Sequence, residues 1–358
     1  MDVGFLSAHN PFDKRQFSGS LFYMRQALEA RSDISLRVLG GHRPPDLSLT
    51  GRILARLRPP QVVTANKIDD AELDFIVAPV ASGLIANLAG RLSTPILLVT
   101  DSTPKFLREF YNMELPESRD RQEALALNEA SLVVYSSEYM LSRALYEFEE
   151  INPSKFSAFP FGINLDNIPT EIPEKRPINQ LQLLFVGRDW HRKGGDIALA
   201  TLDILVSRGV AAYLTIIGCN PDAARGRANV IVHSYLDKNN PKDLAMINSC
   251  YKQAHIFLLP TRGDCTPMVV AEANAWGCPV LITRTGGIPS LMNEGRNGMM
   301  IDYGASAENW ADAVQALIFD PDRYSMLVRS SVQHCHENLT WSTWADNIVS
   351  LLTAQMKD

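Results

Sequence analysis

The fold is decided by the stretch LQLLFVGRDWHRKGGD, residues 181–196, in which an apolar run of strand length ends at a polar turn. Gly187 and Arg188 follow the run at once, and Lys193 comes just before two glycines that open the next helical stretch. This order is typical of a βα unit in a parallel sheet. Two cations at the carboxyl end of one strand can converge on an anion, so the turn predicts a diphosphate site. A solvent-exposed basic turn would have the same sequence.

The same alternation of short apolar runs and longer amphipathic stretches extends outward from this point over the whole chain. It predicts strands at residues 3–7, 34–39, 74–80, 96–100, 132–136, 156–161, 181–186, 212–217, 229–233, 256–260 and 280–283. It predicts helices at residues 18–30, 82–91, 119–129, 137–149, 196–207, 242–252, 268–276 and 307–318. We therefore expect an α/β fold of two doubly wound, Rossmann-like domains that face a cleft.

The boundary between the domains is expected at residues 167–180, NIPTEIPEKRPINQ, because this segment is polar and rich in proline. It separates an N-terminal domain, residues 1–166, from a C-terminal domain, residues 181–338. Residues 339–358 carry apolar side chains at spacings of three and four, which predicts an amphipathic helix. We expect this helix to return to the N-terminal domain and to bury its apolar face there.

A second polar turn, GDCTPMVVAEA at residues 263–273, also follows an apolar strand. Pro267 is expected in the first turn of the next helix, where proline is favoured, and the N–H groups at this helix start predict an anion site. Glu272 would lie one to two turns inside the helix, within reach of a ribose hydroxyl. Asp264 could instead be an ordinary helix-capping acid.

Two further turns contain glycine where a backbone must approach an anion closely. Residues 283–289, TRTGGIP, follow another strand, although a plain loop is equally consistent with them. Gly19 precedes the first long helix, and it would let the N-terminal domain approach the same diphosphate when the domains close.

Composition and charge restrict the possible functions. The net charge of −6 argues against nucleic-acid binding, which needs a surplus of Lys and Arg. The five cysteines are odd in number and scattered, and none forms a CxxC pair. We therefore expect neither a disulfide framework nor a zinc site, and we expect the protein to work in a reducing cytoplasm. No secretory signal opens the sequence, and prolines interrupt its longest apolar region, residues 75–99.

One short stretch leaves a peripheral membrane contact open. Residues 52–58, RILARLR, are basic and amphipathic, and such a segment can touch an anionic bilayer. Two prolines end the stretch after less than two helical turns. An ordinary surface helix is therefore the favoured interpretation.

In this order and at these distances, the polar turns resemble the retaining glycosyltransferases of family 4, which adopt the two-domain GT-B fold. The resemblance covers essentially the whole chain. The family's Gly-Arg-x4-Lys-Gly element matches residues 187–194, its Glu-x7-Glu element matches Asp264 and Glu272, and its Gly-Gly-x-Pro element matches residues 286–289. The later Asn-Gly turn of the family matches Asn297 and Gly298.

The resemblance implies a role for each site residue. Arg188 and Lys193 would bind the diphosphate, Glu272 the ribose and Asp264 the hydroxyls of the transferred sugar. The backbone of the helix start, at Cys265, Thr266, Pro267 and Met268, would also contact sugar and phosphate. Gly19, expected from its place before the first long helix, belongs to the same predicted nucleotide-sugar site. The resemblance also implies no metal and a front-face displacement in which a leaving-phosphate oxygen helps to deprotonate the acceptor.

The implied activity is that of a retaining hexosyltransferase with no required cofactor. Its donor would be a UDP-sugar or, next in order, a GDP-sugar, and its acceptor a carbohydrate, a lipid-linked compound or a small molecule. Loops at residues 9–16 and 102–111 of the N-terminal domain are expected to contact the acceptor. A nucleotide-sugar 2-epimerase of the same fold and a non-catalytic nucleotide-sugar-binding subunit are the alternatives.

The sequence departs from the family pattern at two positions near the transferred sugar and at one in the turn expected to bind the diphosphate. The first acid is Asp264 rather than Glu, so its side chain is one methylene shorter. Many members carry His-Asp where this chain has Thr100 and Asp101. Asp101 is then the catalytic candidate on the N-terminal side, although an acid at a strand end is also a common helix cap. Ser290 stands where an acid is frequent.

Overall fold

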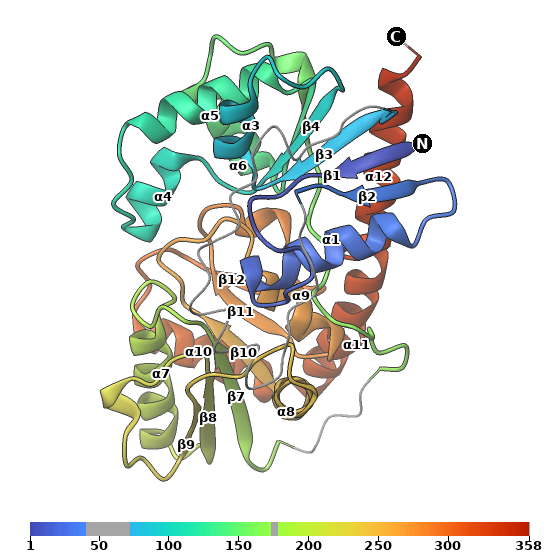
Figure 1. Cartoon of the computed structure of the whole chain (residues 1–358). Coiled ribbons are helices and arrows are strands. Elements are labelled where there is room, and N and C mark those ends of the chain that lie inside the picture. Colours follow the sequence, from blue (N-terminus) through green and yellow to red (C-terminus); the bar gives the residue numbers. More distant parts are fainter. Residues whose placement is uncertain (41–71, 173–177, 358) are drawn as a thin grey trace, which may run out of the picture. The chain divides into compact units, whose positions relative to one another are not determined.

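The computed structural model describes residues 1–40, 72–172 and 178–357 (Figure 1). The chain divides into two compact units. The first comprises Met1–Gly162 and Trp341–Asp358, and the second comprises Ile163–Thr340. The basic stretch at residues 52–58 lies outside the described residues, so its predicted surface helix stays a prediction.

The first unit is built on a parallel six-stranded sheet with the order β2-β1-β3-β4-β5-β6. Its strands are β1 (Asp2–Phe5), β2 (Ser35–Val38), β3 (Phe75–Pro79), β4 (Ile96–Thr100), β5 (Leu132–Tyr135) and β6 (Phe156–Ala158). Its helices include α1 (Ser20–Glu29), α3 (Ser82–Leu88), α4 (Pro104–Tyr111), α5 (Ser118–Glu129) and α6 (Glu138–Glu147). All residues of β3, β4 and β5 are buried, as expected for the central strands of a parallel sheet with helices on its faces.

The second unit repeats this architecture with the sheet order β12-β11-β10-β7-β8-β9, again with all neighbours parallel. The strands are β7 (Leu181–Val186), β8 (Ala212–Ile217), β9 (Val230–His233), β10 (Ile256–Leu259), β11 (Val280–Thr283) and β12 (Gly298–Ile301). The helices include α7 (Gly195–Ser207), α8 (Pro241–Gln253), α9 (Met268–Ala275), α10 (Ala307–Ile318) and α11 (Pro321–Asn338). The predicted fold class, two Rossmann-like α/β domains, is confirmed.

The C-terminal helix α12 (Trp341–Gln355) packs in the first unit, against α1, as the sequence predicts (Figure 1). It buries Trp341, Trp344 and four further apolar side chains of the predicted stripe or its neighbours. The ring of Trp341 lies 5.7 Å from that of Phe161. Gly162 is required at this contact, because a β-carbon there would lie 2.3 Å from the backbone nitrogen of Trp341.

Four elements differ from the sequence prediction. Residues 102–111 were expected to be a loop, but Pro104–Tyr111 forms helix α4. Thr103 is its N-cap and accepts a hydrogen bond from the Phe106 N–H at 3.2 Å, and Pro104 lies in the first turn of the helix. Helix α11 and strand β12 were not predicted at all. Strand β6 ends at Ala158 rather than at residue 161.

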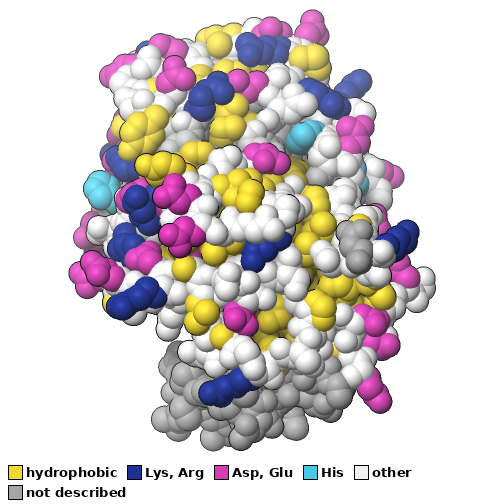
Figure 2. All heavy atoms as spheres, turned by 90° about the horizontal axis from the view of Figure 1, so that it is seen from above, with side chains coloured by type: hydrophobic (Ala, Val, Ile, Leu, Met, Phe, Trp, Pro, Cys, Tyr) yellow, Lys and Arg dark blue, Asp and Glu magenta, His cyan; other side chains and the backbone are white. Residues whose placement is uncertain are grey.

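The surface of the described chain carries both signs of charge. On the face in Figure 2, Lys and Arg side chains are interspersed with Asp and Glu side chains. No helix within residues 1–40, 72–172 and 178–357 combines the length and the apolar content that a bilayer crossing needs.

Candidate functional site

The site forms at the topological switch point of the second unit. Strands β7 and β10 are neighbours in the sheet, although β8 and β9 separate them in sequence. The chain leaves β7 and β10 in opposite directions across the sheet, so the loops after these two strands flank the point at which ligands bind in open α/β sheets. Both predicted polar turns, the one after β7 and the one after β10, start at this point.

The two turns meet through an ion pair between their charged side chains. Lys193 Nζ lies 2.5 Å from Asp264 Oδ2. Arg192 approaches the other carboxylate oxygen at 3.8 Å and donates to the Gly263 carbonyl at 2.9 Å. Asp264 is only 3% exposed, and these cations compensate its buried charge. The structure thus brings together Lys193 and Asp264 as predicted and adds Arg192, which the sequence prediction missed.

Glycine permits the close approach of three turns at this point. A β-carbon on Gly194, whose φ is +75°, would lie 1.8 Å from the Pro260 carbonyl oxygen. A β-carbon on Gly286, whose φ is +54°, would lie 2.0 Å from the Asp264 carbonyl oxygen, which also accepts from the Gly287 N–H at 3.2 Å. The loops after β7, β10 and β11 are therefore packed directly against one another.

A bidentate ion pair holds the loop after β10 against α7. The Arg262 guanidinium donates to both carboxylate oxygens of Asp196, at 2.9 and 2.7 Å. The Arg262 N–H also donates to the Arg192 carbonyl at 2.7 Å. Burial raises the pKa of the Asp196 carboxyl, but the hydrogen bonds and the charge of Arg262 together lower it below its usual value. These contacts fix the backbone from which Asp264 projects.

Arg188 lies at the same strand end but in a different environment. Its side chain is exposed, and its guanidinium lies 5.9 Å from the centre of the Tyr235 ring, on the loop after β9. Such a cation–π contact at an exposed site is worth about 0.5–1 kcal/mol. Arg188 can therefore turn toward an anion at low cost, whereas Lys193 is held by Asp264.

Helix α9 starts at Met268, as the apolar pattern predicts, but the place expected for Pro267 is wrong. Pro267 is the residue that precedes α9 rather than part of its first turn, and it makes no side-chain cap. Helix α9 begins at Met268 and carries Glu272 in its second turn, as predicted. Cys265 and Thr266 are buried in the loop that leads to it. An N-terminus capped by proline leaves its N–H groups without a side-chain acceptor from that position.

Glu272 is held by two donors that the sequence prediction missed. Lys238, after β9, donates from Nζ to Oε1 at 2.5 Å, and Tyr251, on α8, donates from its hydroxyl to Oε2 at 3.0 Å. Glu272 is 1% exposed and Tyr251 is fully buried. Burial and then the charge of Glu272 raise the pKa of the Tyr251 hydroxyl well above its usual value, so the phenol stays protonated and donates.

The predicted residues of the first unit lie at the carboxyl ends of its strands. Asp101 follows β4 and accepts from the Ser102 hydroxyl at 3.2 Å. The alternative that Asp101 caps the next helix is wrong, because Thr103 is the N-cap of α4. Thr100 is buried, and its hydroxyl donates to the Ser102 carbonyl at 3.4 Å.

Gly19 precedes α1 with a φ of +102°. The two residues before it, Phe17 and Ser18, also have positive φ, at 46° and 58°. Three successive residues in left-handed conformations make an unusual turn, and strain of this kind clusters at functional sites. The turn lies after β1, whose neighbours in the sheet are β2 and β3, and so at the switch point of the first unit.

A group of buried polar atoms in the first unit is unexpected from sequence. Glu123, on α5, is 6% exposed, and burial raises the pKa of its carboxyl from 4.5 to about 7. Within the described residues, Glu123 Oε1, Glu147 Oε2 and the Tyr135 hydroxyl have no hydrogen-bond partner. The nearby charges of Glu123 and Glu147 contribute to a raised pKa of Tyr135, after burial itself.

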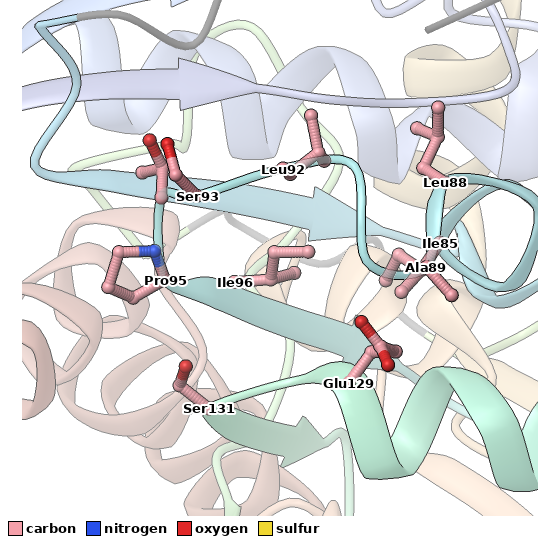
Figure 3. A pocket seen from close by; sticks show the side chains of 10 residues that line it. Ile85, Leu88, Ala89, Leu92, Ser93, Pro95, Ile96, Glu129 and Ser131 are labelled. Atoms are coloured by element: carbon pink, nitrogen blue, oxygen red, sulfur yellow. The ribbon is translucent and has the colours of Figure 1, made fainter.

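Two cavities of the described chain lie away from these strand ends. One, of about 190 Å³, is lined by Ile96 at the start of β4, by Ser131 just before β5, and by Glu129 (Figure 3). The other, of about 300 Å³, is lined by Leu181 at the start of β7 and by Ala211 just before β8. Both open at the amino ends of parallel strands, which is not where ligands bind in such sheets.

Side chains of the types that ligate metals are spread out in the described parts of the chain. Nowhere within them do three His, Cys, Asp or Glu side chains gather closely enough to hold an ion. All five cysteines are free thiols.

Known sequences are similar to this chain, above all in its second unit. The family of glycosyl transferases group 1 matches residues 180–320, which contain the three packed turns. D-inositol 3-phosphate glycosyltransferase of Corynebacterium glutamicum is 26% identical over 262 residues, which are 66% of this chain and 61% of the relative. The enzyme of the same name from Corynebacterium diphtheriae is 30% identical over 188 residues, which are 49% of this chain and 43% of the relative. The matches therefore span less than two thirds of either relative.

Solved structures resemble the whole chain. Sucrose-phosphate synthase from Thermosynechococcus elongatus superposes with a TM-score of 0.69 at 15% identity, covering 100% of this chain and 99% of the other. Anabaena Alr3699/HepE, solved in complex with UDP, gives a TM-score of 0.68 at 14% identity, covering 99% and 100%. At this identity the likeness concerns the fold. Together, the comparisons confirm the resemblance to the family 4 glycosyltransferases and to their GT-B fold.

Proposed function

Starting from a chain that resembles the family 4 glycosyltransferases, we propose that it transfers a hexose-type sugar from a nucleoside-diphosphate sugar to an acceptor hydroxyl. The observation that carries the proposal is the convergence of Lys193, Asp264 and the α9 start at one switch point. This arrangement offers a cation, backbone donors and a buried carboxylate within one small region. A diphosphate joined to a sugar needs the first two for its phosphates and the third for sugar hydroxyls.

Each group has a separate task in this proposal. Lys193 and Arg188 neutralise the diphosphate, and the backbone from Cys265 to Met268 supplies further donors. Asp264 accepts from hydroxyls of the transferred sugar, and Glu272 accepts from the ribose. The pair between Lys193 and Asp264 places the phosphate-binding and sugar-binding groups 2.5 Å apart, which suits a bond that joins a phosphate oxygen to a sugar carbon.

The reaction we propose retains the configuration of the anomeric carbon. The bond from this carbon to the leaving phosphate oxygen breaks while the acceptor oxygen approaches from the same face. As this bond breaks, its electron pair stays on the diphosphate, and Lys193 and Arg188 stabilise the developing negative charge. The acceptor proton passes to a leaving-phosphate oxygen, which partly neutralises that charge. No metal is required in this scheme, and Asp101 and Gly19 of the first unit are proposed to contribute on the acceptor and phosphate sides.

UDP is the favoured donor nucleotide and GDP the second choice. The structurally similar Alr3699/HepE was solved with UDP and with UDP-glucose, which supports UDP. The relatives named for inositol phosphate support a small hydroxylated acceptor, and carbohydrate or lipid-linked acceptors fit the same chemistry. The free thiols support a reducing cytoplasmic environment.

The test is an assay of the purified chain with UDP- and GDP-hexoses, a panel of hydroxylated acceptors, and a metal chelator in every reaction. We expect a glycoside with the donor's anomeric configuration, read by NMR. Conversion of the donor to its 2-epimer without acceptor would show that the chain is an epimerase. Tight nucleotide-sugar binding with no product from any acceptor would favour a non-catalytic binding subunit.

A further inference from the structure

We propose that Lys238 and Tyr251 are positioning residues that aim the Glu272 carboxylate at the ribose and so make the site select ribonucleotides over deoxyribonucleotides. The inference rests on the proposed function, because it takes Glu272 as the ribose acceptor. It adds two residues outside the motifs that identified the site. Neither Lys238 nor Tyr251 is within the polar turns after β7, β10 and β11.

The two donors fix the carboxylate from different elements. Lys238 lies after β9 and reaches Oε1, whereas Tyr251 lies on α8 and reaches Oε2. Glu272 itself projects from α9, so three elements meet at one group. A carboxylate with one donor on each oxygen cannot rotate without breaking a contact.

The occupied carboxylate still has capacity for a ligand. An ionised carboxylate offers about four acceptor positions, and the two contacts use only two of them. One position on each oxygen is left. Two acceptor positions on adjacent oxygens match a vicinal diol, which is the pair of hydroxyls that a ribose presents and a 2′- or 3′-deoxyribose lacks.

The charges explain why a lysine is needed there. Glu272 has a side chain that is 2% exposed, so its negative charge requires a nearby cation. The Lys238 side chain is 17% exposed and supplies that cation. The Tyr251 ring is buried beside Phe257, with 6.2 Å between ring centres, and this packing limits where its hydroxyl can point.

The experiment measures dissociation constants by calorimetry for UDP, 2′-deoxy-UDP and 3′-deoxy-UDP, and for the corresponding GDP series. The wild-type chain is expected to bind the ribonucleotide about tenfold or more tightly than a deoxy analogue, as for loss of a hydrogen bond to a charged acceptor. Tyr251→Phe removes one oxygen only and is expected to reduce this ratio by about threefold or more. Lys238→Met is expected to bring it close to one.

Matched controls separate positioning from general damage. Tyr324 is buried in the same unit and donates its hydroxyl to the His255 carbonyl at 3.1 Å, so Tyr324→Phe loses an equivalent contact far from Glu272 in sequence and function. Lys242 is an exposed lysine at the start of α8, so Lys242→Met makes the same charge change. Both variants are expected to keep the wild-type ratio.

A double-mutant cycle protects the test against misfolding of Lys238→Met. In Glu272→Gln the ratio is expected to be low, and adding Lys238→Met to it should change the ratio no further, because Lys238 acts through Glu272. Unchanged ratios in both Tyr251→Phe and Lys238→Met would overturn the positioning role alone. Failure of the wild-type chain to bind any nucleoside diphosphate would overturn the proposed function, and this inference with it.

Discussion

The two units share a parallel six-stranded sheet, but they differ in how they treat buried acids and in what lies at their switch points. In the second unit, the buried carboxylates of Asp264 and Glu272 are each paired with a lysine. In the first, Asp13 is paired with Arg15, but Glu123 is buried with one oxygen unpartnered, and the raised pKa of its carboxyl reflects that burial. Charged side chains on the loops after β7 and β10 mark the switch point of the second unit.

The switch point of the first unit carries charge too, since Asp13 pairs with Arg15 in the loop after β1, but its backbone conformation sets it apart. Phe17, Ser18 and Gly19 follow β1 with positive φ, and Val80 directly follows β3 with a φ of 50°. A positive φ is a true outlier for a β-branched residue such as Val80. The comparison teaches that one sheet architecture can carry non-glycine residues with positive φ in one unit, whereas every described residue with positive φ in the other unit is a glycine. The strained turns and the charged turns can each be tested.

The largest expected effect is on the pH dependence of the first unit's stability, and it concerns the buried carboxyl of Glu123. Because the pKa of Glu123 rises from 4.5 to about 7 on folding, the folded chain holds this proton more tightly than the unfolded chain. Its contribution to stability is therefore greatest below pH 4.5 and is lost as the pH rises to about 7, a loss of about 3 kcal/mol. Glu123→Gln should remove this part of the pH dependence in urea unfolding of the first unit.

The surroundings of Glu123 set the sign of that effect. Ser82 and Arg119 favour the ionised carboxylate, Asp120 and Glu147 oppose it, and burial outweighs them all. Glu129→Gln, an exposed acid later on the same helix, is the control and should retain the wild-type profile. If the free energy of unfolding depended on pH in the same way in Glu123→Gln and in the wild type, the pKa of Glu123 would not be raised by folding.

The next effect tests the charged switch point. Lys193→Ala should weaken UDP or GDP binding by about 1.5–3 kcal/mol, because it removes a charge-assisted contact to phosphate. Calorimetry measures this directly, with Lys242→Ala as a control that changes an exposed lysine of the same unit. Equal affinities for the wild type and Lys193→Ala would move the phosphate site elsewhere.

The smallest effect tests the strained switch point. Val80→Gly should raise the free energy of unfolding by about 1 kcal/mol, because glycine adopts positive φ without the cost that valine bears. Val210→Gly, at a half-buried valine outside the positive-φ set, should lower it. Chemical denaturation compares the two variants, and destabilisation of both would mean that Val80 is not strained.

Much of this architecture follows from the sequence, because strand-length apolar runs fix the sheets. The bounds of β4, β7, β8, β11 and α10 agree with the prediction. The missed helices carry signals that were readable: Thr103 before Pro104 for α4, and Asp320 before Pro321 for α11, where an N-cap precedes a first-turn proline. Strand β12 has no such signal, since it depends on tertiary contact: a β-carbon on Gly298 would lie 2.0 Å from the Val280 carbonyl.

The sequence predicted those site residues that lie in a polar turn just after an apolar strand, and it missed the others. Lys193 and Asp264 stand directly after apolar strands, so their position at the switch point follows from strand order. Lys238 stands in a polar loop with other charged residues, and Tyr251 looks like one more apolar residue of α8. Their contact with Glu272 joins residues 21 and 34 positions away in sequence, and only folding brings them together.

The most direct test of the central claim is amide hydrogen exchange of the wild-type chain with and without saturating UDP, read by peptide. If the diphosphate binds at the switch point of the second unit, protection should appear at residues 187–196 and 263–272. Saturated binding that protects neither segment, with protection confined to other parts of the chain, would contradict the account.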